Sequence, residues 1–172
     1  NHPTDDIDGI MLAVMEGIAY GCGDAMIGVN PVEDNVENTK RIANAVYKFM
    51  EDWSCPTQSS VLSHITTQMQ AVKEGAPLSL FFQSIAGTEP ALRAFGITTE
   101  MLDEADDLIR HKGIASGPNL MYFETGQGSE MSIDADCGVD EMTLEARTYG
   151  YGKRYKPFCV NNVSGDRKST RL

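Results

Sequence analysis

The chain lacks the features that would place it in a membrane or on a nucleic acid. No apolar run approaches the roughly 18 residues of a transmembrane helix, and no secretory signal peptide opens the chain at Asn1. Positive charge is scarce, because 14 Lys and Arg stand against 25 Asp and Glu, giving a net charge of −11. Nucleic acids and anionic membranes attract basic surfaces, so we expect neither as a partner.

Patterns typical of metal sites and disulfide frameworks are also missing. The four cysteines are far apart and form no C-x-x-C pair: Cys22, Cys55, Cys137 and Cys159. We therefore expect reduced thiols, with neither a disulfide framework nor a zinc site. The acidic segment 130–141 lacks the D-x-[DN]-x-[DN]-G series of a calcium loop, so we interpret it as a solvated loop and helix start and expect no metal.

What is present is an ordinary globular composition, 41% hydrophobic and 23% charged, in a chain long enough for one sizeable core. Apolar residues at helical spacing predict helices over 6–21, 32–53, 68–74, 99–111 and about 139–150. Short apolar runs bounded by turn residues predict strands over 24–31, 61–66, 78–87, 119–124 and 156–163. Strands and helices that alternate in this way indicate parallel pairing through right-handed crossovers.

Two architectures fit this alternation, a closed (β/α) barrel and an open doubly wound sheet. No G-x-G-x-x-G follows the first strand, which disfavours the dinucleotide-binding form of the open sheet. We favour an α/β fold that is part of a TIM (β/α)8 barrel. Only about five of its eight strands are predicted, so we expect the first and last strands to be missing and the chain to be a piece of a larger enzyme.

The end of the chain differs from the rest in composition. We expect residues 1–163 to form the barrel fragment and 164–172 to be a separate tail with the basic sequence Asp-Arg-Lys-Ser-Thr-Arg-Leu at its end. One interpretation is a disordered terminus. We prefer the hypothesis that these seven residues are the translation of a sequencing adapter, and we exclude them from the prediction of fold and function.

Glu124 is the first candidate site residue. It ends the predicted strand 119–124 and precedes a glycine-rich turn, at the strand end where an α/β barrel carries its active site. A buried unpaired charge is costly, so packing alone does not explain a carboxylate there. The residues leave a second interpretation open, in which Glu124 pairs with a neighbouring arginine or caps the next helix.

Five segments resemble the large subunit of ethanolamine ammonia-lyase. They are Asp5–Gly17, Ile27–Val32 (IGVNPV), Phe82–Gly87 (FQSIAG), Gly117–Asn119 (GPN) and Met121–Glu130 (MYFETGQGSE). The resemblance runs from Asn1 to about Val163, and its motifs are long and gapless. It implies a TIM-barrel enzyme that uses adenosylcobalamin to convert ethanolamine to acetaldehyde and ammonia by a radical mechanism. It also implies a small subunit that helps to hold the corrinoid, and a homo-oligomer of large subunits.

The resemblance assigns roles to particular positions. Glu124 matches the catalytic, substrate-binding carboxylate of the family, and Asn30 matches its substrate-binding amide. Positions near the bound cofactor are matched, with decreasing strength, by Ser84, Gly126, Val163 and Gln83. A carboxylate and an amide suit the substrate ethanolamine. A carboxylate binds an ammonium group through a charge-assisted hydrogen bond, and an amide both donates and accepts hydrogen bonds. The cofactor supplies the radical, so neither residue need be a nucleophile.

Some residues near these positions have a simpler interpretation. Phe123 and Val29 suit the shielding of radicals from water, and they are equally expected as packing residues. His64 stands near a predicted strand end and could contact substrate or corrinoid. A lone histidine beside an apolar run is more often a hydrogen-bonded structural residue, and that is the interpretation we favour.

In the family, further substrate-binding residues lie on strands that would precede Asn1 or follow Val163. We therefore expect this chain to hold about half of an active site and to be inactive and poorly folded alone. The family also implies a cytoplasmic protein of bacteria, within a microcompartment in some. Two alternatives stay open: a TIM-barrel enzyme on another small amino-alcohol without a corrinoid, and a non-catalytic scaffold subunit.

Overall fold

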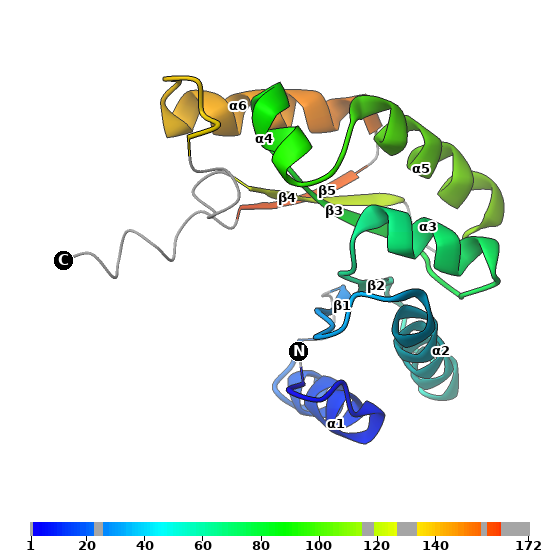
Figure 1. The fold of residues 1–172 in the computed structure, drawn as a ribbon. Coiled ribbons are helices and arrows are strands. Elements are labelled where there is room, and N and C mark those ends of the chain that lie inside the picture. Colours follow the sequence, from blue (N-terminus) through cyan, green and yellow to red (C-terminus); the bar gives the residue numbers. More distant parts are fainter. Residues whose placement is uncertain (1, 23–25, 115–118, 127–133, 156–157, 163–172) are drawn as a thin grey trace.

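The structure of the chain is a computed structural model, which describes residues 2–22, 26–114, 119–126 and 134–155 and the backbone of 158–162. Helices and strands alternate along most of it (Figure 1). The first half contains α1 (Ile7–Ala19), β1 (Ile27–Val29), α2 (Val36–Asp52), β2 (Ser59–Val61), α3 (Ile65–Lys73) and β3 (Phe81–Ile85). The second half contains α4 (Glu89–Ala94), α5 (Thr99–Lys112), β4 (Met121–Thr125), α6 (Glu141–Gly152), the 3₁₀ helix η2 (Lys153–Tyr155) and β5 (Phe158–Asn162).

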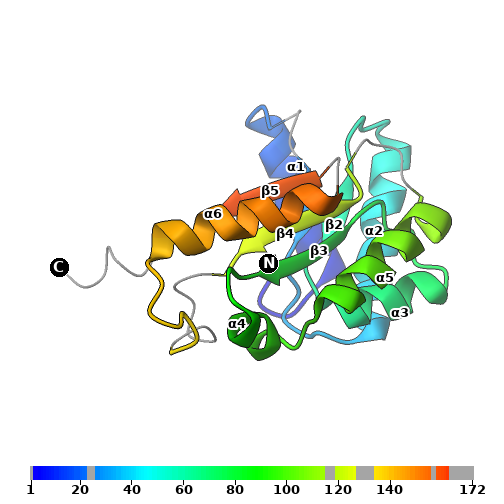
Figure 2. The same cartoon turned by 90° about the horizontal axis from the view of Figure 1, so that it is seen from above.

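All strand pairs are parallel, which confirms the predicted α/β class. β1 pairs with β2, and β3, β4 and β5 form a three-stranded sheet in that order (Figure 2). Within the described ranges the outer edges of β1 and β5 pair with no further strand, so no closed barrel is seen. The (β/α)8 barrel therefore stays a prediction.

Side chains join the two sheets where backbone pairing stops. The Ser59 N–H donates to the Ser79 hydroxyl oxygen, and that hydroxyl donates to the Ser59 carbonyl, both over 2.9 Å. The side-chain amide of Gln58 donates to the carbonyls of Ser79 at 3.5 Å and Asn119 at 2.5 Å. These bonds place β2 beside β3 and continue the order of the strands from one sheet to the other.

The two faces of the β3-β4-β5 sheet have different surroundings. Phe81, Ile85, Met121 and Phe123 belong to a large apolar cluster that includes residues of α2, α3 and α5. Figure 1 shows α4, α5 and α6 together on one side of this sheet. The alternate positions carry a second cluster, which we call the inner cluster: Leu80, Phe82 and Tyr122, with Met26 and Leu62 against it. Alternation along a strand sends neighbouring side chains to opposite faces, so the sheet is covered on both.

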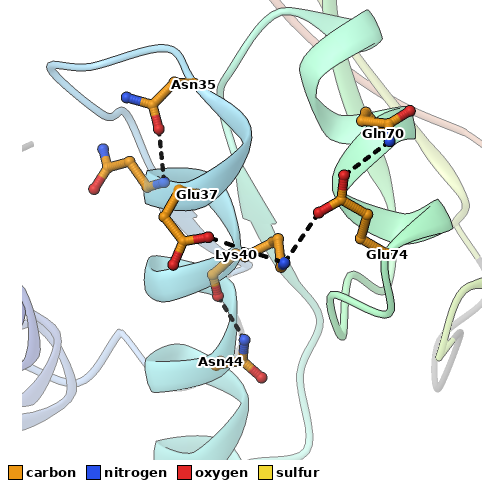
Figure 3. Close-up of polar contacts among 7 residues, drawn as sticks. Asn35, Glu37, Lys40, Asn44, Gln70 and Glu74 are labelled. Carbon is orange, nitrogen blue, oxygen red and sulfur yellow. Dashed lines mark hydrogen bonds and ion pairs between the residues drawn. The ribbon is translucent and has the colours of Figure 1, made fainter.

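An exposed polar network joins α2 to α3 (Figure 3). The Lys40 ammonium lies 3.0 Å from a Glu74 carboxylate oxygen, and the Gln70 amide donates to the other oxygen at 2.8 Å. The hydrogen bond from Gln70, and then that from Lys40, lowers the pKa of Glu74, while the bond to Glu74 raises the pKa of Lys40. Because exposed ion pairs add little stability, we attribute the packing of these helices to their apolar faces.

The structure corrects three predicted boundaries. The predicted strand 61–66 is wrong, because β2 ends at Val61 and α3 begins at Ile65, with the His64 side chain accepting from the Thr66 N–H as its cap. That helix therefore starts before the predicted residue 68. The predicted helix 32–53 begins only at Val36, where the Asn35 side chain caps it by accepting from the Asn38 N–H.

One α-helix was not predicted. α4 has six residues, too few for apolar periodicity to be visible, and Thr88 caps it just before Pro90 in its first turn. Among the described residues no helix is long and apolar enough to cross a membrane.

Candidate functional site

Ser84 and Glu124 lie side by side at the carboxyl ends of β3 and β4. They are register partners in the parallel ladder, and both are half-buried. They occupy the same alternate positions as Phe82 and Tyr122, so they lie on the face of the inner cluster, one step closer to the strand ends. The structure thus brings together two of the predicted site residues.

Asn30 directly follows β1, at the carboxyl end of a strand in the neighbouring sheet. Gly28 pairs with Ser60, and the Leu62 N–H donates to the Val29 carbonyl at 2.8 Å, so the ladder continues to the level of Asn30 and Leu62. Leu62 packs against the inner cluster. Alternation therefore places the exposed Asn30 on the face of β1 that carries Gly28, beside Leu62 and toward the inner cluster.

The inner cluster forms an apolar floor below Ser84 and Glu124, and Asn30 lies beside its member Leu62. Leu80 is 1% exposed, and the rings of Phe82 and Tyr122 lie with centroids 5.5 Å apart at 49°. An apolar floor keeps water away and strengthens electrostatic interactions above it. A small cation bound at this level would therefore interact strongly with the Glu124 carboxylate.

Glu124 itself is held by a neighbour on the same strand. The Tyr122 hydroxyl donates to Glu124 Oε1 over 2.7 Å. Among the described residues, Glu124 takes part in no ion pair, and α6 is capped by Asp140, which accepts from the Thr143 N–H at 2.9 Å. Neither the arginine pair nor the helix cap of the simpler interpretation is found there.

Asp5 fixes the loop that follows Asn30, a role that the sequence did not predict. Asp5 is 2% exposed, and its carboxylate accepts from the N–H groups of Val32 and Glu33 at 2.9 Å and from the Asn38 amide at 2.8 Å. Burial alone would raise the pKa of Asp5, but these hydrogen bonds and the Arg41 charge outweigh it, so its pKa is lowered.

A signal for Asp5 was present in the sequence. Two adjacent acids, Asp5 and Asp6, precede α1, and the helix needs only one as its cap. Asp6 fills that role by accepting from the Gly9 N–H at 2.8 Å. The other acid was therefore free for a long-range contact, although its partners could not be read from the sequence.

The positions matched to cofactor contacts differ in their surroundings. Among the described residues the Ser84 hydroxyl makes no hydrogen bond, so it is available to a ligand. Gly126 is buried, and a Cβ there would lie 2.4 Å from the Phe95 ring, so protein occupies that side of it. Gln83 is 4% exposed and accepts from the Ile65 N–H at 2.9 Å. Val163 lies outside the described residues.

His64 has the structural role that we favoured. Its Nδ1 accepts from the Thr66 N–H at 3.3 Å and lies 2.7 Å from the Thr66 hydroxyl, while Nε2 lies 3.0 Å from the Phe95 carbonyl. A carbonyl accepts only, so Nε2 carries a proton and Nδ1 is the acceptor. Both ring nitrogens are engaged by the protein.

The acidic segment 130–141 lies only partly within the residues that the structure describes. Asp140 is the cap of α6, as the interpretation of a helix start requires, and Asp136 accepts from the Gly138 N–H at 3.2 Å. Across the ranges that the structure describes, no three His, Cys, Asp or Glu side chains are grouped so that they could hold a metal ion. Cys22, Cys55 and Cys137 are free thiols.

The chain is an α/β protein whose parallel strands end in a carboxylate, a hydroxyl and an amide, and these three residues form the candidate ligand site. Residues 1–166 match the family model described as "Ethanolamine ammonia lyase large subunit (EutB)". The chain therefore belongs to the ethanolamine ammonia-lyase large-subunit family.

Individual relatives agree with this family. The chain is 47% identical over 165 residues to the ethanolamine ammonia-lyase large subunits of Salmonella typhimurium strain LT2 and Escherichia coli strain K12. Each alignment covers 96% of this chain and 36% of the relative. The chain thus spans about a third of the length of the curated relatives that it matches.

Proposed function

We propose that this chain contributes part of the active site of a carbon–nitrogen lyase that converts ethanolamine to acetaldehyde and ammonia. The observation that carries the proposal is Glu124, a half-buried carboxylate beside Ser84, above an apolar floor and with no ion pair among the described residues. Membership of the family and 47% identity to two large subunits support this choice of substrate.

Each residue has a defined task in this reaction. The Glu124 carboxylate binds the substrate ammonium through a charge-assisted hydrogen bond, and the Asn30 amide holds the hydroxyl end. The inner cluster beneath them excludes water, which strengthens the ion pair and protects reactive species. Glu124 also stabilises the amino group as it moves and leaves as ammonia, so its charge is needed throughout the reaction.

We propose that the inner face also contacts adenosylcobalamin, the cofactor that the resemblance implies. The half-buried Ser84 hydroxyl is available beside Glu124, and it suits the hydroxyl groups of an adenosyl moiety. Gly126 has no side chain and would contribute only backbone atoms, and Phe95 fills the space that a Cβ would take. When bound, the cofactor supplies the radical chemistry that side chains lack.

We further propose a (β/α)8 barrel as the setting of the site, with a small subunit and other large subunits as partners. Three observations support the barrel: the strands are parallel, β2 lies beside β3 so that the strand order continues between the sheets, and the sheet is buried on both faces. Because the outer edges of β1 and β5 pair with no further strand in the described part of the chain, we expect the 172-residue chain alone not to turn over ethanolamine.

The test is Glu124→Gln in a full-length large subunit that carries this sequence, assembled with its small subunit and adenosylcobalamin. The substitution keeps the shape and removes the charge, so we expect kcat/KM for ethanolamine to fall at least about 100-fold. Glu51→Gln, at an exposed α2 residue without an ion pair among the described residues, is the control and should leave kcat/KM unchanged. Retention of activity by Glu124→Gln would reject the proposal.

A further inference from the structure

The hydrogen bond between Tyr122 and Glu124 joins two residues of one strand. The donor is a phenol hydroxyl and the acceptor is Oε1 of the carboxylate, with 2.7 Å between the two oxygens. Residues two apart on a strand face the same side, so the bond runs along the inner face of β4 toward the strand end. It engages one carboxylate oxygen of Glu124.

Tyr122 is held firmly enough for its hydroxyl to fix the position of the Glu124 carboxylate. Its side chain is 7% exposed, and its ring packs against Phe82 in the inner cluster. The backbone of β4 pairs with β3 on one side and β5 on the other, which fixes the strand that carries both residues. A rigid donor on a central strand is the kind of support that fixes a binding carboxylate.

We propose that Tyr122 is a positioning residue, whose hydroxyl fixes the rotation of the Glu124 carboxylate so that Oε2 faces the substrate ammonium. This inference rests on the proposed function, because it requires Glu124 to bind a cation. A free glutamate rotates about its terminal torsion and presents its oxygens in many orientations. With Oε1 held by a short charge-assisted bond, Oε2 is offered in one orientation.

The chain supplies a matched control in Tyr155. Its hydroxyl donates to Asp103 Oδ1 over 2.8 Å, and its side chain is 3% exposed. The Tyr155 ring packs on Phe123, so it lies on the opposite face of β4 from Tyr122. Tyr155→Phe thus removes the same group from the same kind of bond, away from the site.

The experiment compares Tyr122→Phe and Tyr155→Phe in the full-length holoenzyme. For Tyr122→Phe we expect kcat/KM for ethanolamine to fall about 10- to 100-fold, the range for a hydrogen bond to a charged group. Tyr155→Phe should lower the unfolding temperature but keep kcat/KM within about threefold. Equal losses of kcat/KM in the two variants would overturn the inference.

A second measurement separates positioning from packing. Propylamine and propanol are used as competing ligands, one cationic at pH 7 and one neutral. We expect Tyr122→Phe to reduce the preference for the amine about 10-fold, whereas lost packing would weaken both ligands alike and overturn the inference. A ratio of two inhibition constants does not depend on the amount of folded enzyme, so it stays informative if the variant is unstable.

The result for Glu124→Gln keeps the two proposals distinct. If Glu124→Gln is inactive and Tyr122→Phe behaves like the parent enzyme, the positioning role fails and the proposed function stands. If Glu124→Gln is active, the proposed function fails and the positioning role fails with it.

Discussion

The side-chain amide of Gln68 pairs with the backbone of Phe82 as a strand would. Its Oε1 accepts from the Phe82 N–H at 2.9 Å, and its Nε2 donates to the Phe82 carbonyl at 2.7 Å. Gln68 is fully buried on α3, and Nε2 also donates to the Ser63 carbonyl at 2.5 Å. One helix side chain therefore satisfies the edge of β3 where β2 has already ended.

We expect Gln68→Leu to destabilise the protein strongly. Leucine fills a similar volume but leaves the Phe82 N–H and the carbonyls of Phe82 and Ser63 without this partner in a buried place. Each buried unsatisfied group costs about 1–3 kcal/mol, so the free energy of unfolding should fall by about 3 kcal/mol or more. Urea unfolding of the full-length protein measures it.

Gln70→Leu is the matched control, because Gln70 lies on the same helix but is exposed, and within the described ranges its side chain bonds only to Glu74. Its free energy of unfolding should change by less than about 1 kcal/mol. If the two substitutions lower the free energy of unfolding by similar amounts, the amide of Gln68 is not what holds α3 to β3.

Much of the fold could be predicted because its patterns are local. The apolar stripe of α2 and the caps and periodicity of α5 appear in the sequence, and the structure confirms both helices. The joint between the sheets could not be predicted, because it depends on polar side chains that contact residues distant in the chain. Gln68 looks like any polar residue of a helix until Phe82 is placed beside it.

The same distinction applies to the site. Glu124 could be proposed because it ends an apolar run at the edge where parallel strands carry their active sites, and Asn30 because the family resemblance matches it to a substrate-binding amide. Asp5 was missed because its partners lie 27 to 33 residues away. Pattern analysis identifies residues that end elements, whereas residues that hold loops in place require the three-dimensional structure.

The lowered pKa of Asp5 predicts how its contribution to stability depends on pH. The folded protein binds the ionised form more strongly, so the contribution is fully present above the ordinary carboxyl pKa near 4 and is lost as the pH falls through the lower folded value. We expect Asp5→Asn to cost about 1–3 kcal/mol at pH 7 and progressively less as the pH falls below about 4.

Urea unfolding at pH 7 and pH 3 checks this expectation. Asp6→Asn is the control, because asparagine caps a helix as well as aspartate and should cost little. A cost of Asp5→Asn that is the same at both pH values would show that the charge of Asp5 is not what holds the loop after Asn30.

Two glycines that contact or belong to α6 should respond oppositely to alanine. A Cβ at Gly87 would lie 2.6 Å from the Leu144 carbonyl oxygen and 2.8 Å from its Cα, both backbone atoms of the helix. Since backbone cannot rotate away, Gly87→Ala must displace α6 from the end of β3, and we expect a cost of about 1–3 kcal/mol. A Cβ at Gly150, within α6, meets nothing within 4 Å, so Gly150→Ala should gain up to about 1 kcal/mol from helix propensity.

Thermal unfolding of both variants and the parent measures the two changes in stability. The comparison is direct, because both substitutions add the same methyl group. The sequence alone gives no reason for opposite signs, since either glycine could be a turn residue. The close approach of Gly87 lets α6 pack against the carboxyl end of β3, beside the strand end that carries Ser84. If Gly87→Ala is as stable as the parent, α6 does not pack there as closely as described, and the support that it gives to the strand end must come from elsewhere.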